Sequence, residues 1–259
     1  MRAFRILALG ALAALLASSP VGAITFGHAD GSDHPNVGAM VVLGSDGERF
    51  AVCSGTLISS TVFLTASHCT AVLAEVGLTD HDVYVTFDET VDASSTLHRG
   101  TAHMNPLYIP AGHQGDPHDV AVIVLDEPIV GIAPAELPTA QLLDQLDLKS
   151  QRFVAVGYGA TRDTKTKGSS SLGDGGSRLA VDQGFRSITK AWLNLSMNPS
   201  IGSGGTCYGD SGGPHFLGTT DVVVALTVTG DRYCRSTDVD YRVDTLESRA
   251  FLAGFVALP

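Results

Sequence analysis

The 259-residue chain has few of the residues that bind metals or polyanions. It has only four cysteines, none in a Cys-x-x-Cys pair, and its nine histidines are scattered. The sequence therefore lacks the ligand spacing typical of a structural zinc site. Basic residues are also scarce, since 16 Lys and Arg stand against 27 Asp and Glu for a formal net charge of −11. A surface this acidic argues against nucleic acid and anionic membranes as partners, and we expect neither, nor a metal.

The most apolar run lies at the start of the chain and is short. Arg2 and Arg5 precede it, and it ends in Val21-Gly22-Ala23, which has the small-x-small pattern of a signal cleavage site. A membrane anchor is the alternative, but Ile6–Ala17 is too short to span about 30 Å of hydrocarbon comfortably. We therefore predict a signal peptide over residues 1–23 and a secreted protein. An even number of cysteines in an exported chain suits two disulfides, with three pairings open.

A serine flanked by glycines is the strongest functional signal, in the segment Gly209-Asp210-Ser211-Gly212-Gly213-Pro214. A serine hydroxyl is a weak nucleophile that needs a base for its proton and N–H groups for the negative charge on the attacked carbonyl. Gly209 has no Cβ, so it can adopt a strained conformation and point its N–H at one oxyanion together with Ser211. A glycine-rich surface turn is the alternative. We predict Ser211 as nucleophile and Gly209 and Ser211 as the oxyanion hole.

The base for this serine must come from upstream. The motif also fits the nucleophile elbow of α/β-hydrolases, in which the histidine follows the serine. Here only His215 follows, and four residues are too few to bring an acid-held histidine back over the hydroxyl. This order excludes the elbow.

Two upstream segments supply the missing groups. Cys53–Ile58 and Phe63–Cys69 resemble consecutive strands with a cysteine at each far end, and the second contains His68. Asp119 precedes the β-branched run Val120–Leu125. A buried carboxylate must be hydrogen-bonded, and accepting a histidine N–H meets that need while fixing the tautomer for base catalysis. The resulting order is histidine, aspartate, serine.

In these three motifs the chain resembles the trypsin/chymotrypsin family of serine proteases. The resemblance extends from about Ile24 to the C-terminus and implies His68 as general base and acid, Asp119 as its orienting partner and Ser211 as nucleophile. Gly157-Tyr158-Gly159 is similar to the Gly-Trp-Gly strand of the family, with Tyr in place of Trp.

The same resemblance implies two further features. The disulfides are expected as Cys53–Cys69 and Cys207–Cys234. Asp210 is expected to pair with a free N-terminal amine in the active form. Since Ile24 follows directly after the predicted cleavage site, signal peptidase itself would create that amine.

The substrate pocket departs from the pattern of trypsin-like members, which carry an aspartate six residues before the nucleophile. That position is Gly205 here, followed by Thr206. Val228-Thr229-Gly230 is expected to form the opposite wall. If Asp238 reaches the floor, the pocket would select Lys or Arg at the cleaved residue; otherwise it would take Leu, Phe or Tyr.

The resemblance implies an all-β fold of two antiparallel β-barrels of the six-stranded type with a C-terminal α-helix. We place the first barrel in residues 24–138 and the second, with the closing helix, in 139–259, together one peptidase domain. Apolar leucines and aromatics recur at helical spacing after Asp244, and Asp244 or Thr245 can cap that helix. Arg162–Ser177 has little to bury and is expected to be a surface loop. Strands are predicted at Ala39–Leu43, Ala51–Ile58, Val62–Ala66, Val83–Phe87, Val120–Leu125, Phe153–Val156, Val222–Val228 and Tyr241–Val243.

The sequence thus predicts a secreted serine endopeptidase that acts through an acyl-enzyme on Ser211. The chemistry requires no cofactor, and the partners are peptide or protein substrates. An esterase-biased hydrolase on the same fold is one alternative. A binding protein without catalysis is the other, although it would have no use for an intact histidine, aspartate and serine set.

Overall fold

The computed structural model describes residues 24–110, 115–160 and 175–259. The predicted signal peptide at 1–23 and most of the predicted loop at 162–177 lie outside them. Within the described ranges, no helix is both long enough and apolar enough to cross a membrane.

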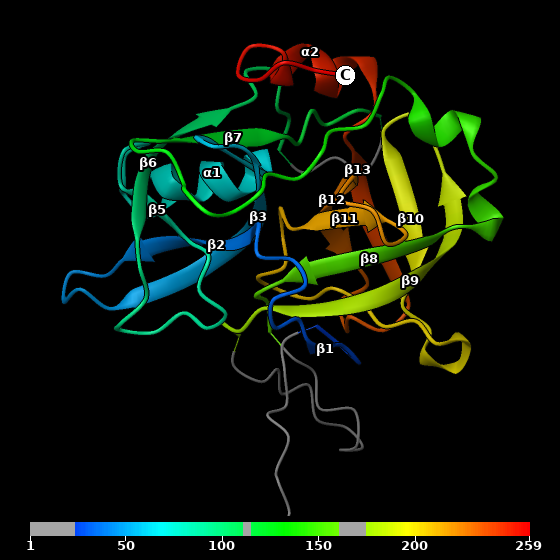
Figure 1. Ribbon diagram of the computed structural model, residues 1–259, viewed down its shortest axis with the longest axis horizontal. Coiled ribbons are helices and arrows are strands. Elements are labelled where there is room, and N and C mark those ends of the chain that lie inside the picture. Colours follow the sequence, from blue (N-terminus) through cyan, green and yellow to red (C-terminus); the bar gives the residue numbers. More distant parts are fainter. Residues whose placement is uncertain (1–23, 111–114, 161–174) are drawn as a thin grey trace, which may run out of the picture.

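The N-terminal half folds into a closed six-stranded antiparallel barrel, on the left of Figure 1. Its strands follow the order β2-β3-β4-β7-β6-β5 around the barrel. Strands β4 and β7 are rich in β-branched and aromatic residues, which favour a pleated, buried surface, and β4 is buried throughout. The bounds are β2 Val37–Leu43, β3 Arg49–Ser59, β4 Val62–Thr65, β5 Val83–Thr86, β6 His98–Met104 and β7 Ala121–Leu125.

The C-terminal half forms a second barrel, on the right of Figure 1. Its sheet has the order β9-β10-β13-β12-β11-β8, and an additional β9–β8 pairing closes it. Strand β1, His28–Ala29, pairs with β9 at the outside of this barrel, although the sequence assigned residues from 24 onward to the first one. The bounds are β8 Arg152–Gly157, β9 Leu179–Ile188, β10 Trp192–Ser196, β11 Pro214–Leu217, β12 Val223–Gly230 and β13 Thr237–Arg242.

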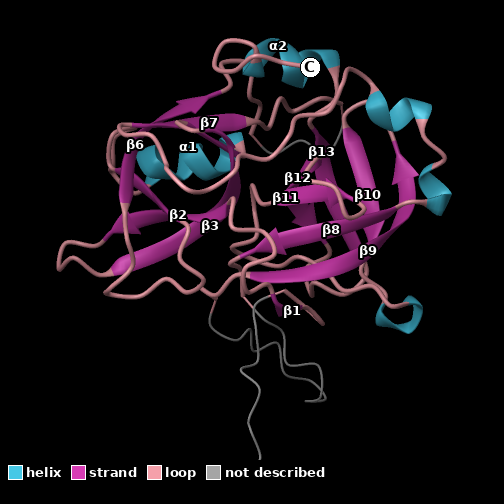
Figure 2. Cartoon of the chain, viewed as in Figure 1, coloured by secondary structure: helices cyan, strands magenta, loops and turns pink. Residues whose placement is uncertain are grey.

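Helices occupy little of the fold (Figure 2). The predicted closing helix is α2, Leu246–Leu252, and the Thr245 side chain caps it by accepting a hydrogen bond from the N–H of Ser248. Helix α1, Ser67–Glu75, was not predicted. The described ranges also contain three short 3-10 helices, Leu142–Gln145, Leu148–Ser150 and Pro199–Ile201.

Polar side chains join the two halves of the molecule. Tyr158, at the end of β8, is buried, and its hydroxyl donates to the carbonyl of Asp88 in the first barrel at 2.8 Å. Burial raises the pKa of Tyr158 to about 12. Arg178 forms a buried ion pair with Asp30 at 2.9 Å and also donates to the carbonyl of Phe87 at 2.9 Å. These contacts fix the barrels against each other, and the expected two-barrel fold with a C-terminal helix is confirmed.

Candidate active site

The side chains of His68 and Asp119 are in direct contact. Asp119 Oδ2 lies 2.8 Å from His68 Nδ1, and its Oδ1 accepts the backbone N–H of His68 at 2.9 Å. Asp119 is buried, whereas the His68 side chain keeps 27% exposure. Both carboxylate oxygens are therefore used to hold one histidine, with its Nε2 edge left for a proton transfer.

Short local structures place these two residues. The chain leaves β4 at Thr65 and turns at once into α1, so His68 lies in the first helical turn instead of at a strand end. Asp119 immediately precedes β7, which pairs with β4. The neighbouring Ser67 donates its hydroxyl to the carbonyl of Val120 at 2.8 Å, which fastens the start of the helix to the start of the strand.

Both expected disulfides are present, Cys53–Cys69 and Cys207–Cys234. The first joins β3 to α1, and one of its sulfurs lies between the histidine and serine segments. Cys69 Sγ lies 3.7 Å from His68 Nε2 and 3.5 Å from the carbonyl oxygen of Ser211. His68 and Ser211, which are 143 positions apart in the sequence, thus both lie close to the Cys69 sulfur at the junction of the barrels.

Ser54 holds the nucleophile loop, and the sequence analysis assigned it no role. Its N–H donates to the carbonyl of Ser211 at 2.8 Å, and its hydroxyl donates to the carbonyl of Gly209 at 3.0 Å. The same hydroxyl accepts the N–H of Tyr158 at 2.9 Å. One buried serine of β3 therefore fixes the backbone on both sides of Asp210.

The loop requires glycine at position 209. Gly209 has φ +98°, which side chains rarely adopt, and a Cβ there would meet the Cα of Gly159 at 2.8 Å. Gly209 therefore has a backbone conformation that favours glycine, and its part in an oxyanion hole stays a prediction.

Asp210 is fully buried beneath the loop. Its carboxylate accepts the N–H of Gly159 at 2.8 Å and the N–H of Cys207 at 2.8 Å. Burial raises the pKa of Asp210 to about 7, with these two hydrogen bonds opposing the rise. A cation placed beside this carboxylate would lower its pKa.

The N-terminal segment enters the same barrel. Thr25 and Gly205 exchange backbone hydrogen bonds of 2.8 and 2.9 Å, and Ile24 packs in a buried cluster that includes Ala155 of β8. Asp210 packs against Gly157, two residues farther along β8, where a Cβ would lie 2.3 Å from Asp210 Oδ1. Alternate residues of a strand face the same side and are roughly 7 Å apart. Ile24 and Asp210 therefore approach neighbouring positions on one face of β8.

A small cavity adjoins Ser211. It has a volume of about 120 Å³, and the predicted wall Val228-Thr229-Gly230 lines it together with Thr206 and Ser211. The remaining lining residues are Cys207, Tyr208, Thr227, Asp231 and Cys234.

Gly205 and Asp238 lie behind the cavity and are not among its lining residues. A Cβ on Gly205 would meet Met197 Cγ at 2.2 Å, so the Met197 side chain packs directly on this glycine. Asp238 is fully buried, with one oxygen accepting from the Thr206 hydroxyl at 2.6 Å and the other from the Gln183 amide at 2.7 Å. The side chain of Thr206 therefore lies between Asp238 and the cavity.

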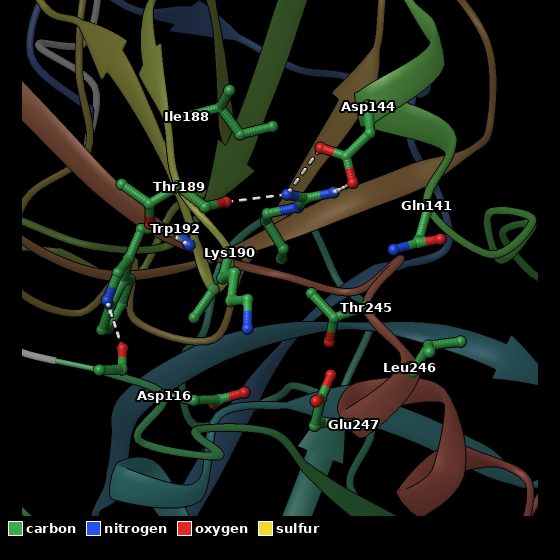
Figure 3. A pocket seen from close by; sticks show the side chains of 13 residues that line it. Asp116, Gln141, Asp144, Ile188, Thr189, Lys190, Trp192, Thr245, Leu246 and Glu247 are labelled. Atoms are coloured by element: carbon green, nitrogen blue, oxygen red, sulfur yellow. Dashed lines mark hydrogen bonds and ion pairs between the residues drawn. The ribbon is translucent and has the colours of Figure 1, made fainter.

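A second and larger cavity lies away from these residues (Figure 3). It has a volume of about 690 Å³ and is lined by the β9–β10 turn, the start of α2 and Asp116. Arg242 crosses its wall and donates to Asp144 at 3.0 Å and to the carbonyl of Thr189 at 2.8 Å. Its charge is thereby paired, and no predicted catalytic residue lines this cavity.

Sequence reasoning missed the supporting residues of the site. Ser54 lay within a quoted motif, Cys-Ser-Gly, but its partners are more than 100 positions away, so no local pattern could reveal them. Met197 and Gln183 occur in strands or loops without a distinctive motif.

Comparison with known proteins agrees with the architecture. A family model described as Trypsin matches residues 27–248, which include the predicted histidine, aspartate and serine and all four cysteines. The chain is also similar to a solved structure described as "HL collagenase structure at 1.7A resolution", with a TM-score of 0.64 and 17% sequence identity. That similarity covers 86% of this chain and 95% of the other and supports the fold.

Proposed function

Because the chain belongs to the trypsin family, we propose that it is a secreted serine endopeptidase that cleaves peptide bonds through an acyl-enzyme on Ser211. Ser211 attacks the scissile carbonyl while His68 takes the hydroxyl proton and returns it to the leaving amine. Water, activated by the same imidazole, then hydrolyses the ester. The N–H groups of Gly209 and Ser211 receive the developing oxyanion.

One observation carries the proposal: Asp119 uses both carboxylate oxygens on His68, through Nδ1 at 2.8 Å and the backbone N–H at 2.9 Å. This arrangement fixes the tautomer in which Nδ1 bears a proton and Nε2 is free to accept one. The His68 side chain keeps 27% exposure, so a base held in this way remains accessible to a substrate.

The surroundings of Asp238 favour an uncharged residue at the cleaved bond. Both of its oxygens already accept hydrogen bonds, from Thr206 and Gln183, and the carboxylate has no exposed surface. A Lys or Arg side chain would have to displace one of these partners. The cavity of about 120 Å³ suits a medium-sized apolar side chain such as Leu.

Matched Leu, Phe, Lys and Arg substrates test this preference. We expect Leu to be cleaved with the highest kcat/KM, and Asp238→Asn to leave the order of preference unchanged. Asp182→Asn, which replaces an exposed acid of β9, is the matched control. A preference for Arg in the wild type that collapses in Asp238→Asn alone would show instead that Asp238 reaches the substrate.

The Ile24 amine and Asp210 form the proposed activation pair. The Thr25–Gly205 bridge and the packing of Ile24 and Asp210 on one face of β8 support it. The sequence of residues 1–23 supports secretion, since signal peptidase would remove them before Ile24.

A serine-directed fluorophosphonate probe tests the proposed function directly. Stoichiometric labelling of Ser211 alone, with cleavage of a denatured protein, is the expected result. Labelling with cleavage of esters but not peptides would favour the esterase. No labelling of folded, processed protein would favour the binding protein.

A further inference from the structure

Four acidic or basic side chains lie close together in the second barrel, and three of them, His215, Asp238 and Asp240, take no part in the proposed chemistry. His215 lies in β11, Asp238 and Asp240 lie in β13, and Asp210 precedes β11, all fully buried. The nitrogen or oxygen atoms of His215, Asp238 and Asp240 lie within 4.8 Å of one another. Burying unpaired charge is costly, so such a cluster persists only where its members compensate each other.

His215 is the basic group nearest to the three buried carboxylates. Its Nε2 forms a hydrogen bond of 2.9 Å with the hydroxyl of Thr227 and lies 2.8 Å from Asp240 Oδ1, an ion-pair distance without hydrogen-bond geometry. Strands β11, β12 and β13 are adjacent in the sheet, and they supply His215, Thr227 and Asp240 in that order. One ring nitrogen therefore connects three neighbouring strands.

Thr227 connects this cluster to the nucleophile loop and to the pocket. Its N–H donates to the carbonyl of Gly213 at 2.9 Å, and its carbonyl accepts the N–H of Gly212 at 2.7 Å. Thr227 also lines the cavity beside Ser211 and leads directly into its wall. The position of Thr227 thus sets the wall of the pocket relative to the nucleophile.

We propose that His215 and Asp240 form an internal ion pair that positions Thr227, and through it the pocket wall, for substrate binding. Neither residue touches substrate, so both are positioning residues. The inference rests on the proposed function for its kinetic consequences, but the ion pair itself is a property of the folded protein.

The charges around His215 support a protonated ring. Its titratable neighbours are Asp240 and Asp238 from β13 and Asp210 from the nucleophile loop. Strand β12 contacts it through the Thr227 hydroxyl, and Ala155 is its register partner in β8. Burial alone would lower the pKa of His215, but the attraction of Asp240 and the other two carboxylates raises it above its ordinary value of 6.5. Burial and the neighbouring Asp238 also raise the pKa of Asp240 well above its ordinary 3.8, and His215 opposes that rise, so both partners carry charge only at pH values above the raised pKa of Asp240.

Kinetics of three variants test the positioning role. His215→Gln and Asp240→Asn keep the shape of the pair but remove its charge, and we expect each to raise KM for a peptide substrate about tenfold, with kcat within about twofold. His215→Ala, which also removes the hydrogen bond to Thr227, should raise KM further. His81→Gln replaces an exposed histidine of the first barrel and should match the wild type. Unchanged KM in all three variants would overturn the proposal.

Thermal unfolding tests the ion pair without any need for activity. A folded-state pKa raised above 6.5 means that the stabilisation from His215 is fully present below pH 6.5 and is lost as pH rises through the folded pKa. The wild type should therefore melt above His215→Gln at acidic pH, with a difference that shrinks at alkaline pH. A difference independent of pH, or stoichiometric divalent metal between His215, Asp238 and Asp240, would overturn the proposal. If the His215 variants fail to fold, Thr227→Val tests the same hydrogen bond from the other partner and should also raise KM.

Discussion

Ser211 and His68 act as one unit in the proposed mechanism, because the hydroxyl attacks only as fast as the imidazole removes its proton. We expect Ser211→Ala and His68→Ala each to lower kcat for amide hydrolysis by roughly four to six orders of magnitude, and the double variant to lose little more. Steady-state kinetics on one peptide measure this, with circular dichroism as the check on folding. Peptidase activity retained by Ser211→Ala would refute the nucleophile assignment.

Ser54 acts on the same loop from the opposite barrel. Ser54→Ala removes the hydrogen bond to the Gly209 carbonyl and leaves the buried N–H of Tyr158 without its acceptor. We expect a loss of stability of about 1–3 kcal/mol and a fall in kcat of about tenfold, because the backbone between Gly209 and Ser211 loses one of the hydrogen bonds that hold it.

The matched control for Ser54 is Thr56→Val on the same strand. Its buried hydroxyl donates to the carbonyl of Asn36 at 3.1 Å, remote from the nucleophile loop. Denaturant unfolding and kcat are measured for both variants. Thr56→Val should lower stability but leave kcat unchanged. If the two variants lowered kcat equally, Ser54 would have no specific effect on catalysis.

The residues that bear chemistry could be predicted from sequence, whereas those that support them could not. His68, Asp119 and Ser211 each occur in a local motif whose residue types the mechanism demands. Ser54 and His215 gain their roles only from partners in other strands, and a histidine followed by Phe-Leu gives no sign that it is fully buried. The burial of Asp238 behind Thr206 likewise depends on the register of β13 with β12.

At the scale of elements, strands with a continuous apolar run were predictable and strands with polar faces were not. Strand β7 is nearly all buried aliphatic, and it was located to within one residue. Strand β6 was missed because its buried residues alternate with exposed or half-buried polar ones, and β9 because its short buried start Leu-Ala-Val is followed by Asp, Gly and Arg. Strands β10 and β11 were also missed, since both are short and interrupt their apolar residues with a polar one. Helix α1 was missed because it starts within two residues of β4.

The Cys207–Cys234 disulfide ties the nucleophile loop to the far wall of the pocket. It closes a loop with a sequence separation of 27, and both cysteines line the cavity beside Ser211. Replacing both with serine should cost about 2–4 kcal/mol of stability and lower kcat/KM at temperatures where the protein is still folded. Serine replacement of Cys53 and Cys69, with a separation of 16, is the comparison.

These two disulfide variants are compared by denaturant unfolding and by kcat/KM on one peptide. If Cys207→Ser/Cys234→Ser lost stability but kept the wild-type kcat/KM, the bridge would hold the barrel together without shaping the pocket.

At the scale of the molecule, the proposed activation couples the N-terminus to the buried acid under the active site. In a chain that retains residues before Ile24, Asp210 has a pKa raised by burial to about 7, above its ordinary 3.8. The stability linked to it is then fully present below pH 3.8 and is lost as pH rises through about 7. A free Ile24 amine would supply the missing cation, so processing should restore stability near neutral pH.

Pairing with Asp210 should also raise the pKa of the Ile24 amine. Its pKa should rise above the unfolded value of about 7.7–8.0, so the stabilisation of the processed form is present below that value and is lost as pH rises through the higher folded pKa. Chains that begin at Ile24 and chains with one extra N-terminal residue, both carrying Ser211→Ala against self-cleavage, are melted between pH 5 and 10. The processed chain should be the more stable at pH 7, and the difference should vanish in Asp210→Asn. In the active background, an extended chain with full activity would disprove the pairing, because its amine could not reach Asp210 from beyond Ile24.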